Sequence, residues 1–494
     1  MLQNISLNKF KAFYDLNDLE IKPLTVLCGV NSGGKSSILK SLLLLKQSYE
    51  NSSASNEATL NGPYTSNGLM KDILHNGKGD VFSIKNTFHI KYRGNKFISS
   101  SKQDVSTAKE LGKITGLNPN KVSSFSIDVL CCIKKGIVLD LWDTNYIEKY
   151  EILITPFAPN GSPIKNQEFK ISMQYRAKGK GKYDISLVNF PTISGIKVNH
   201  HLYNCTCYFS GMRLTNLFYE SSNYTSMPIV LNDFLTNIYS IFRIVSDQYS
   251  GIKYLGPLRE NPKRQYAISN DYFNTNSTGA DTPFVLAKEK GKRVIPELYP
   301  PYTEDSFENK VNPQNKDLFE LVQSWMKYFE LGNLEIQNKK DSLQVNIKHN
   351  NIADVGFGIS QILPVIVHGL AMEFEQTLIL EQPEIHLHPR MQMRMSDFLL
   401  SLSQTNHCVI VETHSDHIIN RLVRRALESG DGNLINNIAI YFVENSSEGS
   451  TVNKIKINRV SGIEDCPKEF FSQFASETSY IVKAGINNIR KGDI

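Results

Sequence analysis

Apolar and polar residues alternate along residues 2–28, and the alternation ends in the apolar run PLTVLC at 23–28. Alternation with a period of two is typical of β-strands, so this part of the chain is predicted to form strands. A glycine-rich stretch follows, after which the leucine-rich residues 37–47 have helical spacing. The pattern therefore predicts a strand, a glycine-rich turn and a helix in direct succession.

Between residues 81 and 210 the chain contains short runs of period two, separated by turns rich in Gly, Asn and Lys. This arrangement is typical of a β-meander. The preceding stretch, 49–67, is rich in Ser, Asn and Gly and is predicted to be an exposed loop. Residues 228–247 have helical spacing, and 252–257 are predicted to form a strand that ends at a turn.

From about residue 316 onward, helical and strand patterns alternate. Helices are predicted at 316–330, from about 360, at 389–404 and at 415–429, a hairpin at 334–348, and strands at 378–381 and 408–412, followed by two strands and a terminal helix. Such alternation predicts an α/β fold, with the period-two region as a β-rich insertion. Because no heptad pattern is sustained, a long coiled-coil arm is excluded.

Composition narrows the class of protein without naming its chemistry. The 494 residues are 40% hydrophobic and 21% charged, with a net charge of +5, which permits contact with nucleic acid but does not establish it. Seven cysteines make no disulfide framework, the first residues lack the regions of a signal peptide, and the longest apolar run, 362–372, is too short to span a bilayer. We therefore expect a soluble, cytoplasmic protein.

Residues 29–36 read GVNSGGKS and fit the P-loop pattern G-x-x-x-x-G-K-[ST] between the predicted strand and helix. Backbone N–H groups of such a loop, together with the helix N-terminus, form a cradle for phosphates. Lys35 is expected to reach the β- and γ-phosphates, and Ser36 to bind Mg²⁺. The predicted nucleotide-binding residues of the loop are Gly29, Asn31, Ser32, Gly33, Gly34, Lys35, Ser36 and Ser37. The motif predicts that the chain binds a nucleoside triphosphate.

Two later strands carry polar residues at their carboxyl ends. The strand TLIL delivers Glu381 beside the P-loop, where a carboxylate holds Mg²⁺ directly or through water. The strand CVIV is followed by ETHS, and there His414 is expected to hydrogen-bond the γ-phosphate or the attacking water.

A second glycine-rich helix start occurs at 356–361, GFGISQ. Glycines and a serine before an apolar helix make another anion-binding N-terminus. One triphosphate does not need two cradles from one chain, whereas in a head-to-tail dimer each second cradle closes over the neighbour's γ-phosphate. The sequence therefore predicts a composite site between two subunits.

Taken together, GVNSGGKS, GFGISQ, EQPEIHLHP and ETHS resemble the motifs of the ABC-type ATPase heads of the SMC, RecF and OLD group. YLGPLRENPKR at 254–264 and CPKEFFSQF at 466–474 resemble, more narrowly, a bacterial ATPase family with members in two-gene antiphage systems. One member is PtuA of the Septu system, whose companion PtuB is an HNH nuclease.

The resemblance implies a role for each matching residue. It makes Lys35 and Ser36 the phosphate and Mg²⁺ residues, Glu381 the acidic magnesium residue and His414 the switch histidine. It places Gly358 and Ser360 in the signature that contacts the partner subunit's nucleotide. The implied cofactors are ATP and Mg²⁺, and the implied partners are a second copy of the chain, a separate HNH-type nuclease subunit and, further, nucleic acid.

The resemblance also divides the chain. An N-terminal lobe of the ATPase head with the P-loop is expected at 1–80, and a β-rich insertion with a helical segment at 81–250. A C-terminal lobe with the signature, acidic and switch motifs is expected at 251–460, and a helical tail at 461–494.

One position departs from transporter-like heads of this type. The residue after the acidic residue is usually a catalytic glutamate, but here it is Gln382. Glutamine orients water but cannot accept its proton, so hydrolysis is expected to be slow and ATP occupancy to act as a switch. Glu384, two residues further on, is the candidate substitute. The predicted catalytic set is Glu381, Gln382, Glu384 and His414.

Several other signals leave two interpretations open. Arg259 in GPLREN either senses ATP or braces the turn, and the basic stretch at 175–182 is either a nucleic-acid contact or a solvated hairpin tip. Arginines 421, 424 and 425 form either a stripe facing a polynucleotide or partner, or a solvated face. The group His200, His201, Cys205 and Cys207 lacks the usual C-x₂₋₄-C zinc spacing and is better interpreted as one strand. His386 and His388 are similarly interpreted as motif scaffolding.

These features favour an ATPase that regulates a bound effector nuclease in antiphage defence. The first alternative is a RecF-type repair or recombination ATPase, and the second is a scaffold in which ATP is never turned over. No H-N-H arrangement or Toprim-like acidic cluster is found in the sequence. Any cleavage is therefore expected to come from a partner chain.

Overall fold

The computed structural model describes most of the chain. The residues outside its description are 54, 92–101, 140–141, 177–180, 192–196, 220–228, 269–276, 295–297, 302–316, 374, 406, 430–432 and 465–494. The predicted terminal helix, the block at 466–474 and the centre of the basic stretch at 175–182 therefore lie outside the described residues.

A central sheet collects the strands that end in the predicted motifs. In spatial order its strands are β11 (Ile252–Leu255), β16 (Thr377–Glu381), β17 (Cys408–Glu412), β3 (Leu24–Gly29), β18 (Ile438–Ser446), β19 (Gly449–Asn458) and β20 (Gly462–Glu464). The neighbours from β11 to β18 pair in parallel, and β19 and β20 add antiparallel strands at one edge. The strands β16, β17 and β3 are strongly apolar because both of their faces are covered.

A larger antiparallel sheet contains the predicted meander. Its strands are β10 (Arg213–Phe218), β9 (Lys197–Ser210), β8 (Lys182–Pro191), β7 (Phe169–Tyr175), β6 (Trp142–Phe157), β5 (Ser124–Leu139), β4 (Val81–Lys91), β1 (Leu2–Phe10) and β2 (Phe13–Glu20), in that spatial order. From β4 to β10 each strand pairs with the next in the chain, so the meander is confirmed. The N-terminal strands join the same sheet because β1 pairs with β4. The predicted domain boundaries stay predictions.

Helices and a small third sheet complete the described fold. The α-helices are α1 (Lys35–Glu50), α2 (Met70–Ile73), α3 (Lys102–Thr115), α4 (Ile229–Ser250), α5 (Thr282–Lys288), α6 (Leu318–Tyr328), α7 (Phe357–Leu370), α8 (Pro389–Ser403), α9 (Asp416–Glu428) and α10 (Asn433–Asn437). The small sheet contains β12 (Tyr266–Ala267), β13 (Leu334–Lys339), β14 (Ser342–Ile347) and β15 (Asn350–Asn351). No described helix has the length and apolarity needed to cross a membrane.

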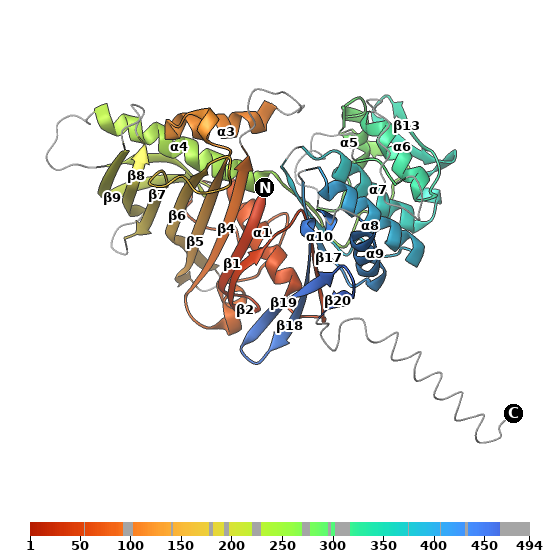
Figure 1. The fold of residues 1–494 in the computed structure, drawn as a ribbon, viewed down its shortest axis with the longest axis horizontal. Helices are drawn as coiled ribbons and strands as arrows, with labels where there is room; N and C mark the ends of the chain where they lie inside the picture. The colour runs from red at the N-terminus through yellow and green to blue at the C-terminus, as the bar shows by residue number, and fades with distance from the viewer. Residues whose placement is uncertain are drawn as a thin grey trace, which may run out of the picture.

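The central sheet separates two hydrophobic cores. Alternate residues of β16 point to opposite faces, so Ile379 packs in one core while Leu378 and Leu380 pack in the other. The first core contains α1, α4 and the inner face of the antiparallel sheet, and the second contains α6, α7, α8 and α9. Figure 1 shows α3 and α4 along the antiparallel sheet, with α5 to α9 on the other side of the molecule. The α/β fold class is therefore confirmed.

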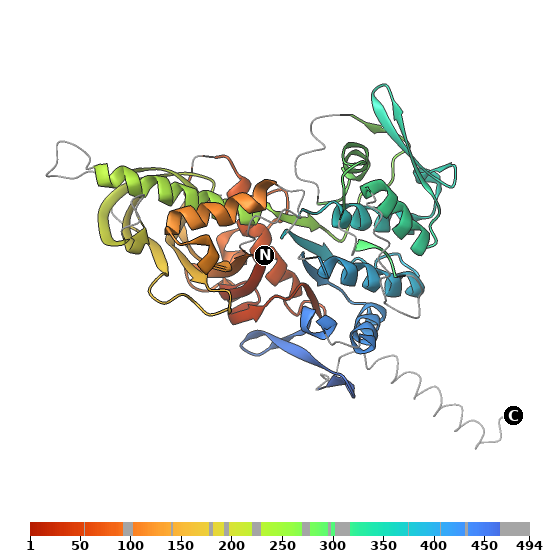
Figure 2. The same ribbon diagram turned by 45° about the horizontal axis from the view of Figure 1, so that its top comes forward.

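The β18–β19 hairpin returns the end of the described chain to its beginning (Figure 2). Lys454 of β19 forms an ion pair of 2.7 Å with Glu20 of β2, and the Ser450 N–H donates to the Ala12 carbonyl over 2.8 Å. Because β18 pairs with β3, this hairpin also lies against the glycine-rich loop that follows β3.

The prediction of an exposed loop at 49–67 was wrong for much of that stretch. The helix α1 continues to Glu50, and the residues beyond it fold onto buried Gln47, whose amide donates to the Thr59 and Thr65 carbonyls over 2.6 and 3.1 Å. The buried residues of this stretch are Tyr49, at the end of α1, and Ala58, Leu60, Thr65 and Asn67 beyond it. A polar segment is buried here because one side chain satisfies its backbone groups.

Candidate nucleotide-binding site

The glycine-rich loop between β3 and α1 needs its glycines for both conformation and space. Gly29 and Gly34 have φ values of 129° and 107°, which other residues rarely adopt. A Cβ atom on Gly29 would lie 2.1 Å from the Val443 carbonyl oxygen, and one on Gly33 would lie 2.6 Å from it. The loop is thus pressed against β18, and side chains at these positions would displace it.

Lys35 and Ser36 are the first residues of α1, behind the N-cap Gly34, whose lack of a side chain leaves the helix start without a side-chain cap. The Lys35 ammonium donates to the Gly29 and Val30 carbonyls over 3.1 and 2.8 Å. Burial lowers the pKa of Lys35, and its side chain is 3% exposed. The loop therefore holds a buried cation beside the uncapped start of a helix, a combination that binds anions.

Ser36 contacts a residue to which the sequence assigned no role. Its hydroxyl lies 3.0 Å from each carboxylate oxygen of Glu412, at the end of β17. Burial, and then the charge of Glu381, raise the pKa of Glu412 to about 7. The available signal was an apolar strand with an acidic residue at its carboxyl end, the same signal that singled out Glu381.

Glu381 ends β16, and its Cα is paired in register with that of Glu412. Its carboxylate accepts a hydrogen bond of 2.9 Å from the Tyr254 hydroxyl of β11. Burial raises the pKa of Glu381. The structure thus brings the two predicted strand ends together, with Glu412 nearer to the loop strand β3 because β17 lies between β16 and β3.

Gln382 begins a tight turn after β16. Its φ of 44° lies in the left-handed region, which is uncommon for a residue other than glycine. Its N–H donates to the Glu412 carbonyl over 2.7 Å, and its own carbonyl accepts from the Ile385 N–H over 3.2 Å. These backbone bonds fix the turn against β17 and hold the following Glu384 over the switch segment.

Glu384 and Arg259 connect that turn to its neighbours. A Glu384 carboxylate oxygen accepts a hydrogen bond of 2.7 Å from the His414 N–H. Arg259 is buried and donates over 3.2 Å to the Glu381 carbonyl. Burial lowers the pKa of Arg259 to about 10, against the opposing charge of Glu384. The hydrogen bond to the Glu381 carbonyl agrees with the interpretation in which Arg259 braces the turn. A role for Arg259 in sensing ATP stays a prediction.

His414 follows β17 with its side chain exposed. Partial desolvation, and then the nearby Lys35 charge, lower the pKa of His414. The structure therefore brings the predicted switch histidine to the neighbourhood of the P-loop lysine and leaves it exposed.

The predicted signature residues Gly358 and Ser360 lie at the start of α7, the helix whose apolar residues pack in the second core. The Ser360 hydroxyl donates to the Phe357 carbonyl over 2.6 Å and is buried. A Cβ atom on Gly358 would lie 3.3 Å from the His386 carbonyl oxygen. Since α1 and α7 pack on opposite faces of the central sheet, the contacts described for these two residues do not reach the P-loop of the same chain.

The cysteine and histidine group lies on β9, as the strand interpretation predicted. Cys205 and Cys207 are buried in the first core, whereas His200 and His201 are exposed. Within the described parts of the chain, no three His, Cys, Asp or Glu side chains are grouped to hold a metal ion. Of the basic stretch, exposed Arg176 lies 3.6 Å from Asp184, and the tip falls in the undescribed residues 177–180.

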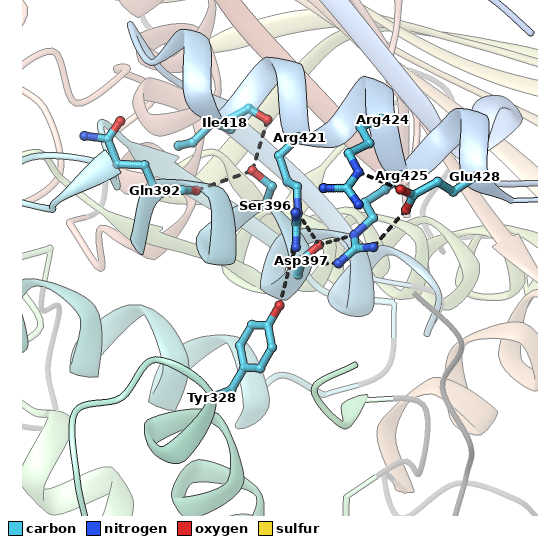
Figure 3. Close-up of polar contacts among 9 residues, drawn as sticks. All are labelled: Tyr328, Gln392, Ser396, Asp397, Ile418, Arg421, Arg424, Arg425 and Glu428. Carbon is cyan, nitrogen blue, oxygen red and sulfur yellow. Dashed lines mark hydrogen bonds and ion pairs between the residues drawn. The ribbon is translucent and has the colours of Figure 1, made fainter. Parts of the chain in front are cut away.

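Both interpretations of the arginines on α9 were wrong for Arg421 and Arg425. Figure 3 shows these two side chains converging on Asp397 of α8, which is fully buried. Their ion pairs with Asp397 are 2.9 and 2.8 Å, and the Tyr328 hydroxyl of α6 donates to the same carboxylate over 2.6 Å. Burial opposes the charge of Arg425, but its bonds to Asp397 and Glu428 outweigh that effect and raise its pKa. The cluster joins three helices and presents no stripe to a partner.

Comparison with known proteins identifies one matching protein family. The family model described as AAA ATPase domain matches residues 1–419. No curated protein matches the chain significantly in sequence.

Similar solved structures include SMC heads. An SmcHead bound to the C-winged helix domain of ScpA has 12% identity and a TM-score of 0.39, and the match covers 93% of this chain and 98% of that one. The SMC head domain from Thermotoga maritima has 8% identity and a TM-score of 0.35, and covers 92% and 99%. Because both TM-scores are below 0.5, these structures support no statement about the site or partners of this chain.

Proposed function

The chain belongs to the family of AAA ATPase domains, and from that premise we propose that it binds ATP with Mg²⁺ at the P-loop, hydrolyses it slowly, and uses ATP occupancy to control an effector. The observation that carries the proposal is the joint placement of Lys35, Ser36 and two carboxylates around one glycine loop. This is the set of groups that phosphoryl transfer requires: a phosphate cradle, a cation and oxygen ligands for a metal.

Each residue of the site has a proposed task. Loop amides and the α1 N-terminus cradle the phosphates, and Lys35 exchanges its loop carbonyls for β- and γ-phosphate oxygens. The Ser36 hydroxyl and the strand-end carboxylates, including the predicted Glu381, are the hard oxygen donors that Mg²⁺ prefers. Bound Mg²⁺ neutralises charge on the phosphate oxygens. The proposed task of His414 is to hydrogen-bond the γ-phosphate, and its backbone N–H donates to the Glu384 carboxylate.

The proposed slow turnover is tested by Gln382→Glu. A glutamate at this position can accept the proton of the attacking water, so kcat is expected to rise by at least about tenfold, a fraction of the ~10²–10⁴-fold that general-base catalysis typically contributes. Steady-state phosphate release at saturating ATP and Mg²⁺ measures it, and Gln382→Ala is the matched control that opens the same space without a base. Turnover of the glutamate variant at or below that of the wild type would count against the proposal.

We propose further that ATP joins two copies of the chain, with Gly358 and Ser360 of each completing the other's site. The placement of α1 and α7 on opposite faces of the central sheet supports this arrangement, because one chain then presents its signature away from its own P-loop. Mass measurement in solution with and without a non-hydrolysable ATP analogue tests it. A monomer at saturating analogue would contradict it.

The effector that we propose is a separate HNH-type nuclease, in an antiphage role like that of PtuA. The motifs at 254–264 and 466–474 support this narrower assignment. Purification with the product of a neighbouring gene, followed by measurement of nuclease activity at several ATP concentrations, tests it. DNA-stimulated ATP turnover without any partner would instead favour the RecF-type alternative. A single-turnover reaction with radiolabelled ATP excludes the scaffold alternative if product forms.

A further inference from the structure

The strand register places Glu412 closer to the P-loop than Glu381. The central sheet runs β16, β17, β3, so Glu381 ends the strand two positions from the loop strand, while Glu412 ends its direct neighbour. Neighbouring strands lie about 4.8 Å apart, so Glu381 starts roughly twice as far away. Glu412 pairs in register with Leu27, two residues before Gly29, the last residue of the loop strand β3.

Both carboxylates are directed to the face of the sheet that α1 covers. Ile379 and Ile410, two residues before Glu381 and Glu412, pack in the core that contains α1. Residues two apart on a strand share a face, so both glutamates lie on the side from which Ser36 approaches. Position along the sheet, rather than choice of face, therefore distinguishes them.

The distance between Ser36 and Glu412 suits a shared divalent cation. The Ser36 hydroxyl oxygen is 3.0 Å from each Glu412 carboxylate oxygen. In an octahedral Mg²⁺ site with bonds of about 2.1 Å, adjacent oxygen ligands are about 3.0 Å apart. A spacing of 3.0 Å therefore fits both states of the site. Without the ion it is a hydrogen bond, and with the ion it is the distance between two adjacent ligands.

The Glu381 carboxylate is hydrogen-bonded to a residue on the side of β16 away from the P-loop. It accepts from the Tyr254 hydroxyl on β11, the strand on the far side of β16 from the loop. That bond draws the carboxylate away from Ser36. Turning Glu381 toward Ser36 would leave a partly buried tyrosine hydroxyl without this acceptor, which costs free energy.

We propose that Glu412 is the carboxylate that binds Mg²⁺ together with Ser36, and that Glu381 acts at longer range through water. This inference rests on the proposed function, since it concerns the cation that accompanies bound ATP. It moves the predicted metal residue from the acidic motif EQPE to the switch motif ETHS. Phosphate oxygens and water supply the remaining ligands, as is usual for Mg²⁺ at nucleotide sites.

Equilibrium binding of a fluorescent, non-hydrolysable ATP analogue tests the assignment without relying on turnover. Affinity is measured in EDTA and in Mg²⁺, and the ratio of the two dissociation constants reports the contribution of the ion. Glu412→Gln is expected to reduce this ratio about tenfold or more, as the loss of a metal-site contact does. Glu381→Gln leaves the Ser36–Glu412 contact intact and is expected to reduce the ratio by a smaller factor than Glu412→Gln does. Ser36→Ala is expected to resemble Glu412→Gln.

Further measurements distinguish the loss of ion binding from misfolding of the variant. Glutamine keeps the size of Glu412 and an acceptor for the Ser36 hydroxyl, and unchanged affinity in EDTA shows that the cradle is intact. Titration of Mn²⁺ by electron paramagnetic resonance, with the analogue present, is expected to show weaker ion binding in Glu412→Gln than in Glu381→Gln. Equal losses, or a larger loss in Glu381→Gln, would overturn the assignment alone. A wild-type protein that binds no analogue in either buffer would overturn the proposed function and this inference with it.

Discussion

Replacing Lys35 with alanine is expected to lower kcat for ATP hydrolysis by about 100-fold or more, the loss seen when one preorganised charge-stabilising group is removed. The Lys35 ammonium is buried at the mouth of the loop and bonded to the carbonyls of Gly29 and Val30. It therefore lies where the β- and γ-phosphates are expected to bind. The low dielectric of its buried surroundings strengthens the attraction between the ammonium and phosphate oxygens. No neighbouring side chain of the loop carries a positive charge that could replace it.

The measurement is steady-state phosphate release, together with analogue binding. The matched control is Lys71→Ala, which removes an exposed lysine from the short helix α2 and is expected to leave kcat unchanged. Turnover of Lys35→Ala within about threefold of the wild type would contradict the assignment of the P-loop as the catalytic site.

Replacing Asp397 with asparagine is expected to lower the free energy of unfolding by about 3–5 kcal/mol, the cost of breaking a buried ion pair from one side. Asp397 and Arg425 are fully buried, and Arg421 is nearly so. The neutral amide removes the buried negative charge that both guanidinium groups share, and Arg425 keeps only its ion pair with the partly exposed Glu428 among the two pairs described above. The Tyr328 hydroxyl also loses a charged acceptor. Urea unfolding measures the difference.

Two further variants separate charge compensation from general damage to the helices. Glu428→Gln removes the partly exposed partner of Arg425 and is expected to cost no more than about 1 kcal/mol. Replacing the whole cluster with apolar residues, by Asp397→Leu, Arg421→Met, Arg425→Met and Tyr328→Phe, is expected to recover much of the loss, because no buried charge remains. An Asp397→Asn protein as stable as the wild type would show that the two arginines do not depend on this carboxylate.

The cluster also bears on the proposed site. The helix α9 begins at Asp416, with Ser415 as its N-cap, immediately after His414. Asp397 fixes that helix to α8 through Arg421 and Arg425, so the backbone that carries the switch histidine is attached to a buried, charged anchor. We therefore expect the Asp397 variant to lose turnover at temperatures where it is still folded.

Local motifs were predicted well because their conformations depend on residues close in sequence. The glycine pattern at 29–36 requires positive φ values, which are found at Gly29 and Gly34, and close backbone approach, which is found at Gly29 and Gly33. Period-two alternation identified the meander, since a strand with one buried face has to alternate. The burial of Ala58 and Leu60 was not predicted from the sequence. It depends on hydrogen bonds that the Gln47 side chain donates to backbone carbonyls further along the chain, and local periodicity does not indicate such bonds.

By itself, then, the sequence determined the strand–loop–helix with its glycine-rich loop, the α/β class and the order of the motif strands along the chain, because each follows from local periodicity and glycine positions. The tertiary structure alone decided which acidic residue meets Ser36, since strand order in a sheet is independent of order in the chain and places Glu412, from a later strand, beside β3. It also decided that Arg421 and Arg425 are buried. Their spacing on α9 resembles a solvated face, and only the packing of α8 brings the Asp397 carboxylate that compensates their charge.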